Sequence, residues 1–440
     1  MQPSSVVHLW NDIMAKRKKI QDYDWRYSLL KRYVDSVFKL SYRPIKYIGK
    51  ENIPTDGAVI FAPNHTGTLM DALVILAMDS KPKAFVARAD IFKNPKLAKL
   101  FRFFKMMPIM RMRDGFDEVK KNNKIIEQAT DVLKDKVPFC IFPEGTHQTK
   151  YSLQPLSKGI FRIALQAKEF MPDTRLYIVP VGIIYGSFWR FRASARVYFG
   201  NPINVGEIIA QNEDKTPQEL MVVMRAALTE RMKDALLYIP NDENYDATYE
   251  ICAAVSSGKC KERLAEDKNT AKRVLEMKEN APEQAVKLFA LANEASKMRK
   301  KRGISLKSVA VKHSFVSQLF RALLLLVTLP YTLAASLLVS PMLLLCNTIF
   351  KKFKDQAFRN SVRMVMNLVL WPLLMIIYAI VAYICLPWQW ALPLTLVMLP
   401  APYLVHDAYK VMRILVSDSR LCRYKELRAK YQEIRAMLFN

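Results

Sequence analysis

Residues 58–71 read "AVIFAPNHTGTLMD", an apolar run that ends in Asn64 and His65 and then reaches Asp71 through a turn with threonine and glycine. A short apolar run with β-branched and aromatic residues is typical of a buried strand. The apolar residues after the turn predict a helix near 69–79. This stretch therefore predicts a strand, a polar turn and a helix, the repeating unit of an α/β domain.

The same alternation continues from residue 42 to about residue 203. Strands are expected at 47–54, 58–63, 83–87, 108–113, 138–145, 176–184 and 195–203, with helices near 69–79, 117–134 and 157–170. Strands separated by helices of this length indicate an α/β domain with a mixed, largely buried sheet flanked by helices. The letters "TPQE" at 216–219 match a capping box with proline at the first helical position, which predicts a helix that runs to about Leu237.

The composition indicates a membrane protein. The chain has 440 residues, with 67 lysines and arginines against 40 aspartates and glutamates and a formal net charge of +27. Such an excess favours a polyanionic partner, either a nucleic acid or an anionic membrane surface. Hydrophobic residues make up 51% of the chain and gather in long runs beside basic clusters, without zinc-finger spacing or an aromatic-interleaved basic motif. Anionic membrane lipids are therefore the expected partner, and no nucleic acid is expected.

Two long stretches, 322–350 and 364–405, contain no acidic or basic residue, which is typical of membrane segments. Basic residues flank both stretches and lie between them, so the positive-inside rule places all three flanks in the cytoplasm. Each stretch must then enter and return, with turns at Pro330 and Pro341 in the first and within "LPWQWALP" (386–393) in the second. We therefore expect an integral membrane protein with two hydrophobic hairpins and its catalytic domain on the cytoplasmic side.

These patterns divide the chain into five parts. They are an N-terminal amphipathic helical segment (1–41), the α/β domain (42–238), a charged helical connector (239–313), a transmembrane region of two hairpins (314–408) and a basic C-terminal tail (409–440). Within the first part, residues 26–40 have an apolar stripe, with Lys31, Arg32 and Lys39 on the opposite side. This helix suits either a membrane surface or packing against the following domain, and the sequence favours neither.

His65 and Asp71 allow two interpretations. The letters "TLMD" that end at Asp71 match a capping box before an apolar run, so the aspartate can serve as a helix cap and His65 as a structural histidine at a strand end. Alternatively, the two residues form a functional pair. The residues next to them leave both interpretations open.

Two further motifs favour a functional site. The run "FCIFPEGT" (139–146) predicts a buried strand that exposes Glu144 and Gly145 at its carboxyl end, where open α/β sheets bind their ligands. Upstream of it, the letters "PIMRMRDG" offer Arg111 and Arg113 on one side of a short strand. Two guanidinium groups at that spacing suit a phosphate.

The order of these blocks resembles the glycerolipid acyltransferases, the family of glycerol-3-phosphate and lysophosphatidate acyltransferases. The resemblance rests on the NH and D of the first turn, the proline–arginine block, FPEGT and a later VPV block, and it covers about residues 42–236. It implies transfer of a fatty acyl chain from acyl-CoA or acyl-carrier protein, as co-substrate, to glycerol 3-phosphate or 1-acylglycerol 3-phosphate, and neither a cofactor nor a metal is expected. It implies His65 as the general base and Asp71 as its orienting carboxylate. The residues expected around the substrates are Asn64, Arg111, Arg113, Glu144, Gly145, Thr146 and Lys158.

This chemistry needs no nucleophile from the protein, because a thioester is already activated. The acceptor hydroxyl takes the place that serine has in a Ser-His-Asp triad, with His65 removing its proton and Asp71 fixing the tautomer. Two departures from the family pattern stand out. Five residues separate His65 from Asp71 instead of the usual four, and Gly67 is expected to absorb the extra residue. His147 follows FPEGT where arginine is common, so phosphate binding is expected to depend more on the lysine and arginines named above.

Other functions stay open. A lysophospholipid acyltransferase for another head group and a CoA-independent transacylase would use the same histidine and aspartate. Outside the enzymes, the alternative is a non-catalytic basic membrane scaffold with a decayed acyltransferase domain, which only the two departures support.

Overall fold

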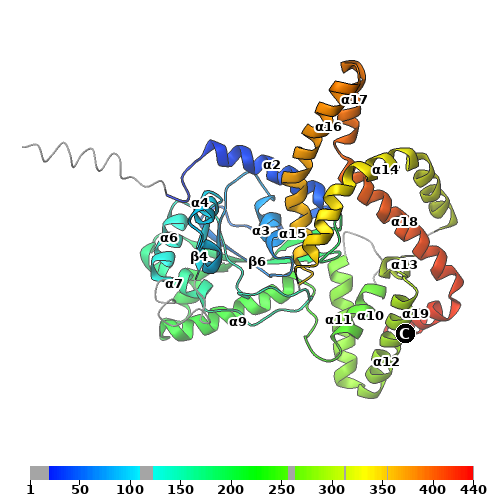
Figure 1. Cartoon of the computed structure of the whole chain (residues 1–440). Helices are drawn as coiled ribbons and strands as arrows, with labels where there is room; N and C mark the ends of the chain where they lie inside the picture. The colour runs from blue at the N-terminus through cyan, green and yellow to red at the C-terminus, as the bar shows by residue number, and fades with distance from the viewer. Residues whose placement is uncertain (1–18, 110–121, 256–262, 312–313, 354, 440) are drawn as a thin grey trace, which may run out of the picture.

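The computed structural model describes residues 19–109, 122–255, 263–311, 314–353 and 355–439 (Figure 1). Within these residues, eight strands form one sheet in the order β1-β7-β6-β2-β5-β3-β4, with β8 beside β6. β6 pairs antiparallel with β7 and β8, and the other neighbours are parallel. The strands are β1 (Ile45–Ile48), β2 (Ala58–Pro63), β3 (Ala84–Arg88), β4 (Met106–Ile109), β5 (Phe139–Cys140), β6 (Leu176–Tyr185), β7 (Ala195–Phe199) and β8 (Ile203–Asn204). The predicted mixed sheet is confirmed.

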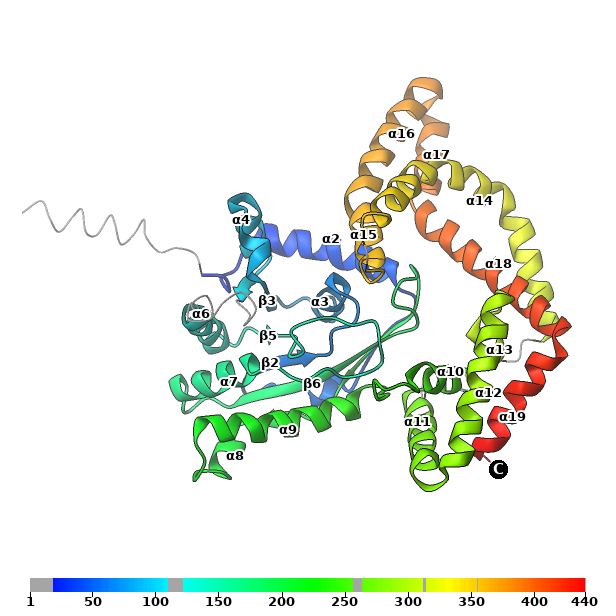
Figure 2. The same cartoon turned by 60° about the horizontal axis from the view of Figure 1, so that its bottom comes forward.

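Helices cover both faces of this sheet (Figure 2). The central strand β2 shows why, because its side chains alternate between the faces and all of its residues are buried. Val59 and Phe61 lie in one core and Ile60 in the other. The first core is shared with α2 (Trp25–Ser41) and α3 (Leu69–Leu76), and the second with α6 (Asn122–Lys134), α7 (Gly159–Phe170) and α9 (Pro217–Ala235). A strand buried on both faces is apolar throughout, as the run at 58–63 is.

Asparagine caps mark two helices that the sequence analysis did not predict. The side chains of Asn94 and Asn204 accept backbone N–H groups at the start of α4 (Pro95–Phe103) and α8 (Val205–Ala210). Asparagine before a helical run is a strong start signal, and it was available in the sequence. The capping box predicted at 216–219 is confirmed at the start of α9.

The helix α2 packs on the α/β domain through one face and exposes apolar side chains on the other. Phe38 is fully buried, whereas Trp25 is 65% exposed and Leu29 is 61% exposed. Lys31 does not lie on an exposed basic side, and that prediction is wrong. It is buried, and its ammonium donates to Asp35 and to backbone carbonyls at and after the end of α3. The unpaired carbonyls at a helix C-terminus attract a cation, which explains the burial of this lysine.

Helices of the predicted connector (239–313) share a core with the last helix, which lies in the predicted tail (409–440). The helices that share this core are α10 (Tyr245–Val255), α11 (Arg263–Asn280), α12 (Pro282–Lys301), α13 (Leu306–Ala310) and α19 (Lys425–Phe439). The buried carboxylate of Glu250 joins them, because it accepts from Arg299 and from the hydroxyl of Tyr431, both at 2.6 Å. The physical reason is an apolar stripe on α19, whose residues Leu427 and Ile434 are buried against the other helices.

The first apolar stretch forms a single bent helix, α14 (Phe315–Phe350), and not a hairpin (Figure 1). The two prolines expected to turn the chain, Pro330 and Pro341, both lie inside this helix. Proline removes one backbone hydrogen bond and bends a helix without having to end it. The predicted first hairpin is therefore wrong, since no glycine in 322–350 accompanies the prolines to make a tight turn.

The second apolar stretch does turn back. Its elements are α15 (Phe358–Val365), a π-helical turn (Met366–Leu370), α16 (Trp371–Cys385), α17 (Trp388–Met398) and α18 (Ala401–Arg423). The chain reverses between α16 and α17 at Leu386 and Pro387, inside the predicted "LPWQWALP". Trp388 and Trp390 follow this reversal and are 70% and 66% exposed.

Two helices among the described residues are long and apolar enough to cross a membrane, Phe315–Phe350 and Phe358–Cys385. Many of their large apolar side chains are exposed, including Phe320, Leu326 and Ile384. Exposed apolar surface on this scale marks a membrane or protein contact. Together with the length of the helices, it indicates association with a membrane.

Candidate active site

The polar turn (64–71) joins β2 to α3 at the carboxyl end of β2. Asn64 fixes the point where the chain leaves the sheet. Its side chain donates to the carbonyl of Ile183 at 3.1 Å and accepts the N–H of Ile183 at 2.6 Å. Ile183 belongs to β6, the strand that pairs with β2. The amide of Asn64 therefore extends the pairing of these strands into the turn and sets the position of the next residue.

His65 and Asp71 meet across this turn. Nδ1 of His65 lies 2.8 Å from Oδ2 of Asp71, with the histidine side chain 20% exposed and the aspartate fully buried. The imidazole stacks on Phe142, with ring centroids 4.4 Å apart. Because Asp71 occupies Nδ1, Nε2 is the nitrogen through which His65 can act on a substrate.

Four donors hold the carboxylate of Asp71. Besides His65, Oδ2 accepts the backbone N–H groups of Thr66 and Gly67 at 2.8 and 2.7 Å. Oδ1 accepts the hydroxyl of Tyr185 at 2.8 Å. Burial, together with the charge of Asp71, raises the pKa of Tyr185 well above its usual value, so the phenol remains a donor. Because Oδ2 of Asp71 accepts at Nδ1 of His65, Nδ1 carries the proton and Nε2 has the lone pair.

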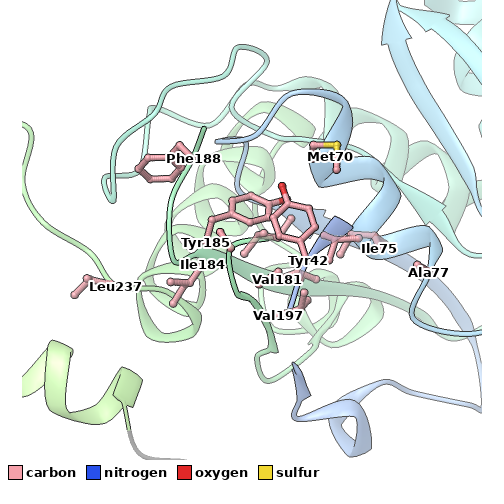
Figure 3. Close-up of a cluster of buried hydrophobic side chains, with 14 of the residues drawn as sticks. Tyr42, Met70, Ile75, Ala77, Val181, Ile184, Tyr185, Phe188, Val197 and Leu237 are labelled. Carbon is pink, nitrogen blue, oxygen red and sulfur yellow. The ribbon is translucent and has the colours of Figure 1, made fainter. Parts of the chain in front are cut away.

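The turn needs glycine at position 67 for space. A Cβ on Gly67 would lie 2.8 Å from Oδ1 of Asp71 and 2.8 Å from the ring of Tyr185. Figure 3 shows this ring beside Tyr42, on which it stacks with centroids 5.2 Å apart. The residue with a positive φ is Thr68, at 56°. The expectation for Gly67 is therefore corrected, since Thr68 adopts the unusual backbone angle that the longer turn requires.

The capping box expected at Thr68 does not form. Thr68 is the N-cap of α3, but its side chain makes no cap hydrogen bond, and its hydroxyl lies 2.8 Å from that of Ser361. Asp71 instead bonds backward to the N–H groups of the turn. The structural and functional interpretations of Asp71 are thus compatible, because one carboxylate stabilises the turn and orients His65.

Glu144, at the end of the neighbouring strand, stabilises the same turn. It follows β5, and its buried carboxylate accepts the N–H of His65 at 2.9 Å and the N–H of Gln154 at 3.2 Å. Burial raises the pKa of Glu144 to about 7, although the hydrogen bonds from His65 and Gln154 oppose the rise. Its contacts are to the protein main chain, so Glu144 positions His65.

Three of the remaining predicted site residues follow Glu144 along the chain. Gly145 has a φ of 68° and open space around it, Thr146 donates to Gln154 at 3.1 Å, and Lys158 is exposed directly before α7. Arg111 and Arg113 lie outside the described residues. In the part of the chain that the structure describes, no group of three or more His, Cys, Asp or Glu side chains gathers to hold a metal ion.

The structure adds a contact that the sequence analysis missed. Nε2 of His147 lies 2.7 Å from Oδ2 of Asp355, in the segment between α14 and α15. The ring of His147 also packs edge-on against that of His65, with centroids 5.6 Å apart. Because 208 positions separate His147 from Asp355, no local pattern could indicate the contact. The available signal was one aspartate in the basic run "KKFKDQ" between two apolar stretches.

Residues 44–184 match the model of a protein family described as acyltransferase. This segment, about a third of the chain, is similar to the acyltransferase family. It is 27% identical over 163 residues to glycerol-3-phosphate O-acyltransferase 2 of Saccharomyces cerevisiae, across 36% of this chain and 21% of that protein. It is 30% identical over 162 residues to 1-acyl-sn-glycerol-3-phosphate acyltransferase of Cocos nucifera, across 37% of this chain and 48% of that protein.

A solved structure also resembles the chain, that of the 1-acyl-sn-glycerophosphate (LPA) acyltransferase from Thermotoga maritima. The sequence identity is 19% and the TM-score is 0.32, over 52% of this chain and 88% of that one. The chain spans less than half the length of the two curated relatives named above. The family match includes both the polar turn and FPEGT, so the resemblance seen in the sequence is confirmed for the segment that carries the site.

Proposed function

We propose that the protein transfers a fatty acyl chain from acyl-CoA or acyl-carrier protein to a hydroxyl of glycerol 3-phosphate or 1-acylglycerol 3-phosphate, with His65 as the general base. The observation that carries the proposal is the 2.8 Å contact between His65 and Asp71 inside the matched acyltransferase segment. The names of the yeast and coconut relatives supply the two candidate acceptors.

The geometry suits direct transfer between the two substrates. Asp71 keeps the proton of His65 on Nδ1, so the lone pair on Nε2 takes the proton from the acceptor hydroxyl. The hydroxyl oxygen bonds to the thioester carbonyl carbon and gives a tetrahedral intermediate. This intermediate collapses as the C–S bond breaks, and the imidazolium of His65 returns the proton to the leaving thiolate. General-base catalysis of this kind contributes roughly 10²–10⁴ in rate.

An amphiphilic product favours an enzyme at the membrane. Acylation of either acceptor yields a lipid, and α14, α16 and α17 expose apolar side chains that suit a bilayer. We place the α/β domain on the cytoplasmic side, because the basic residues beside the apolar helices would meet anionic lipids there. The proposed reaction uses neither a cofactor nor a metal.

One observation favours a second acceptor class. Position 147 holds histidine where the family commonly has arginine, which suits a lysophospholipid with a further head group as acceptor, by acyl transfer or transacylation. A non-catalytic scaffold would have no need of the bonded pair of His65 and Asp71.

The test is acyl transfer by the purified full-length protein from labelled acyl-CoA, or from acyl-carrier protein, to each glycerol phosphate acceptor. His65→Ala should lower transfer by about 10²–10⁴. His406→Gln is the matched control, because His406 lies on α18 against Phe191, and it should keep full activity. Transfer only to lysophospholipids with a further head group would replace the proposed acceptor. Undiminished transfer by His65→Ala would reject His65 as the base.

A further inference from the structure

The helix α4 presents an apolar stripe that the described part of the chain leaves uncovered. None of its residues is buried, and Leu97 and Leu100 are both 44% exposed. Together with Phe101 and Phe104 they follow the spacing i, i+3, i+4 and i+7, which places the four side chains on one side of the helix. A helix of 9 residues is marginal in water by itself. Its stability therefore requires a partner that covers the stripe.

The surroundings of this stripe are strongly basic. Residues 91–109 include five lysines and arginines and neither an aspartate nor a glutamate. The acidic residue just before them, Asp90, pairs with Arg88. Four of the five basic residues are exposed, and the salt bridges among the described residues include none of the four, which are Lys93, Lys96, Lys99 and Arg102. Exposed cations beside an apolar stripe suit a partner that is both apolar and negatively charged.

The outer face of α2 adds apolar side chains next to α4. Trp25, Leu29 and Tyr33 follow one another at intervals of four residues along α2 and are 65%, 61% and 41% exposed. Tyr27 joins the two helices, because its ring packs edge-on against that of Phe103 in α4, with centroids 6.1 Å apart. The sequence favoured neither of two roles for α2, and this neighbour with the same exposed chemistry favours contact with a membrane surface.

The other end of α2 reaches the apolar helices. The hydroxyl of Tyr33 donates to the carbonyl of Leu368 at 2.6 Å, and Leu368 lies in the π-helical turn that leads into α16. In both views α2 runs along one side of the α/β domain between α4 and α15, and α16 and α17 project away from the domain on that side (Figures 1 and 2). From Tyr33 to Trp25 the helix rises by only about 12 Å. A bilayer around α16 and α17 would therefore have its surface beside α2 and α4.

We propose that α4 docks on the surface of an anionic bilayer, with Leu97 and Leu100 among the lipid chains and the exposed cations at the lipid phosphates. This contact is separate from the long apolar helices and does not depend on the proposed reaction. It has a consequence for the site, because α4 follows the carboxyl end of β3 and the polar turn follows that of β2, in the parallel part of the sheet. Docking brings the edge of the sheet that holds His65 close to the lipid.

Electron paramagnetic resonance of a spin label at Leu100→Cys tests the docking in the full-length protein. The exposed cysteines Cys385 and Cys422 are first replaced by serine, together with Cys260. In vesicles of mixed phosphatidylcholine and phosphatidylglycerol, dissolved oxygen should reach the label and a water-soluble nickel complex should not. In pure phosphatidylcholine the nickel complex should reach it. Val222→Cys is the matched control, since Val222 is 62% exposed on α9, across the sheet from α2, and its label should stay open to the nickel complex in both.

Removal of the cations provides the second test. Lys96→Gln, Lys99→Gln and Arg102→Gln together remove three charges from α4. One cation near an anionic membrane contributes about fivefold to binding, so the docking constant should fall by roughly a hundredfold. The nickel complex should then reach the label at Leu100→Cys in anionic vesicles. The control variant removes the same charge from exposed positions of α11 and α12 and should leave the label shielded, through Lys272→Gln, Lys287→Gln and Lys297→Gln.

Three results would overturn the proposal. Access of the nickel complex to the label in every vesicle would mean that α4 faces water. Shielding from both oxygen and the nickel complex would mean that protein covers the stripe, and spin–spin broadening that disappears on dilution with unlabelled protein would identify a second copy. Shielding that depends neither on phosphatidylglycerol nor on the three cations would reject the anionic partner. Since these measurements use no turnover, a failure of acyl transfer would reject the proposed function and leave the docking of α4 standing.

Discussion

Two pairs, each of a histidine and a carboxylate, lie next to each other in this protein. Their contact distances are similar, but their surroundings differ. His65 and Asp71 are 2.8 Å apart, and His147 and Asp355 are 2.7 Å apart. Asp71 is fully buried with donors on both oxygens, whereas the Asp355 side chain is 46% exposed. A buried carboxylate is costly to leave without its partners, whereas water screens an exposed pair. The first pair therefore suits a fixed geometry, whereas water weakens the second.

The two pairs also form in different ways. Six positions separate His65 from Asp71, so the polar turn alone can bring them together. The second pair joins residues 208 positions apart and depends on the placement of the linker segment (355–361), which connects α14 to α15. Substitutions in the first pair should therefore lower kcat strongly, and those in the second should lower it far less.

Among substitutions in the two pairs that keep both histidines, Asp71→Asn should have the largest effect. An amide cannot accept from four donors, and an NH₂ group turned toward His65 would favour the wrong tautomer. We expect kcat to fall by about 10²–10⁴, measured as labelled acyl transfer, with circular dichroism used to check the fold. Asp355→Asn is the matched control and should change kcat far less. Equal losses of kcat in the two variants would break the distinction between the pairs.

Gly67→Ala tests the close approach inside the first pair. The new Cβ would lie 2.8 Å from Oδ1 of Asp71 and from the ring of Tyr185, so the carboxylate must shift. We expect kcat to fall by about tenfold to a hundredfold, because small displacements of catalytic groups are costly. Gly159→Ala is the control, since a Cβ there meets its nearest atom, on Ile109, at 3.9 Å. An unchanged kcat in Gly67→Ala would show that the turn can move around the added methyl.

Local patterns explain why much of the first pair was predictable from the sequence. The buried run at 58–63 and the strand before Glu144 identify the two strand ends, and the order of motifs suggested that His65 and Asp71 act together. Their roles in the reaction remain predictions. The angle at Thr68 was not predictable, because a threonine adopts a positive φ only where the surrounding structure imposes it.

The second pair and the course of the chain through the apolar region could not be predicted from the sequence. A basic linker between apolar runs gives no indication of which side chain it reaches. Prolines were equally ambiguous, since Pro330 and Pro341 bend α14 whereas Pro387 accompanies a chain reversal. The difference lies in the preceding residue, because Leu386 is extended with φ −132° and ψ 149°, the conformation that a following proline favours.

Glu144, which accepts the backbone N–H of His65, gives a pH-dependent prediction. Burial raises the pKa of Glu144 to about 7, above the value of about 4.3 expected in the unfolded chain. The folded protein therefore binds this proton more tightly, so the stability from this group is complete below the unfolded pKa and is lost as the pH rises through the folded pKa. The free energy of unfolding of the wild type should fall relative to Glu144→Gln between about pH 5 and pH 8, by on the order of 3 kcal/mol. Thermal unfolding of both proteins in one detergent across this pH range measures the difference in their free energies of unfolding. A difference that stays constant with pH would contradict the prediction.

Ser361→Ala should have the smallest effect of these substitutions and tests whether the two pairs depend on each other. It removes one hydroxyl of the buried 2.8 Å contact with Thr68, the contact that links the linker segment to the polar turn. Such a hydrogen bond contributes about 0.5–1.5 kcal/mol. Thr68→Val removes the other hydroxyl and keeps the β-branched shape at the positive φ, so the double variant should be little worse than either single one.

The kinetics of these variants show whether the two pairs are separable. If the linker segment serves only the second pair, each substitution should leave kcat near the wild-type value. A clear fall of kcat in Ser361→Ala would mean that the linker segment also maintains the polar turn. The geometry of His65 and Asp71 would then depend on a residue 290 positions farther along the chain than Asp71. Their closeness in sequence would no longer explain why they form a pair.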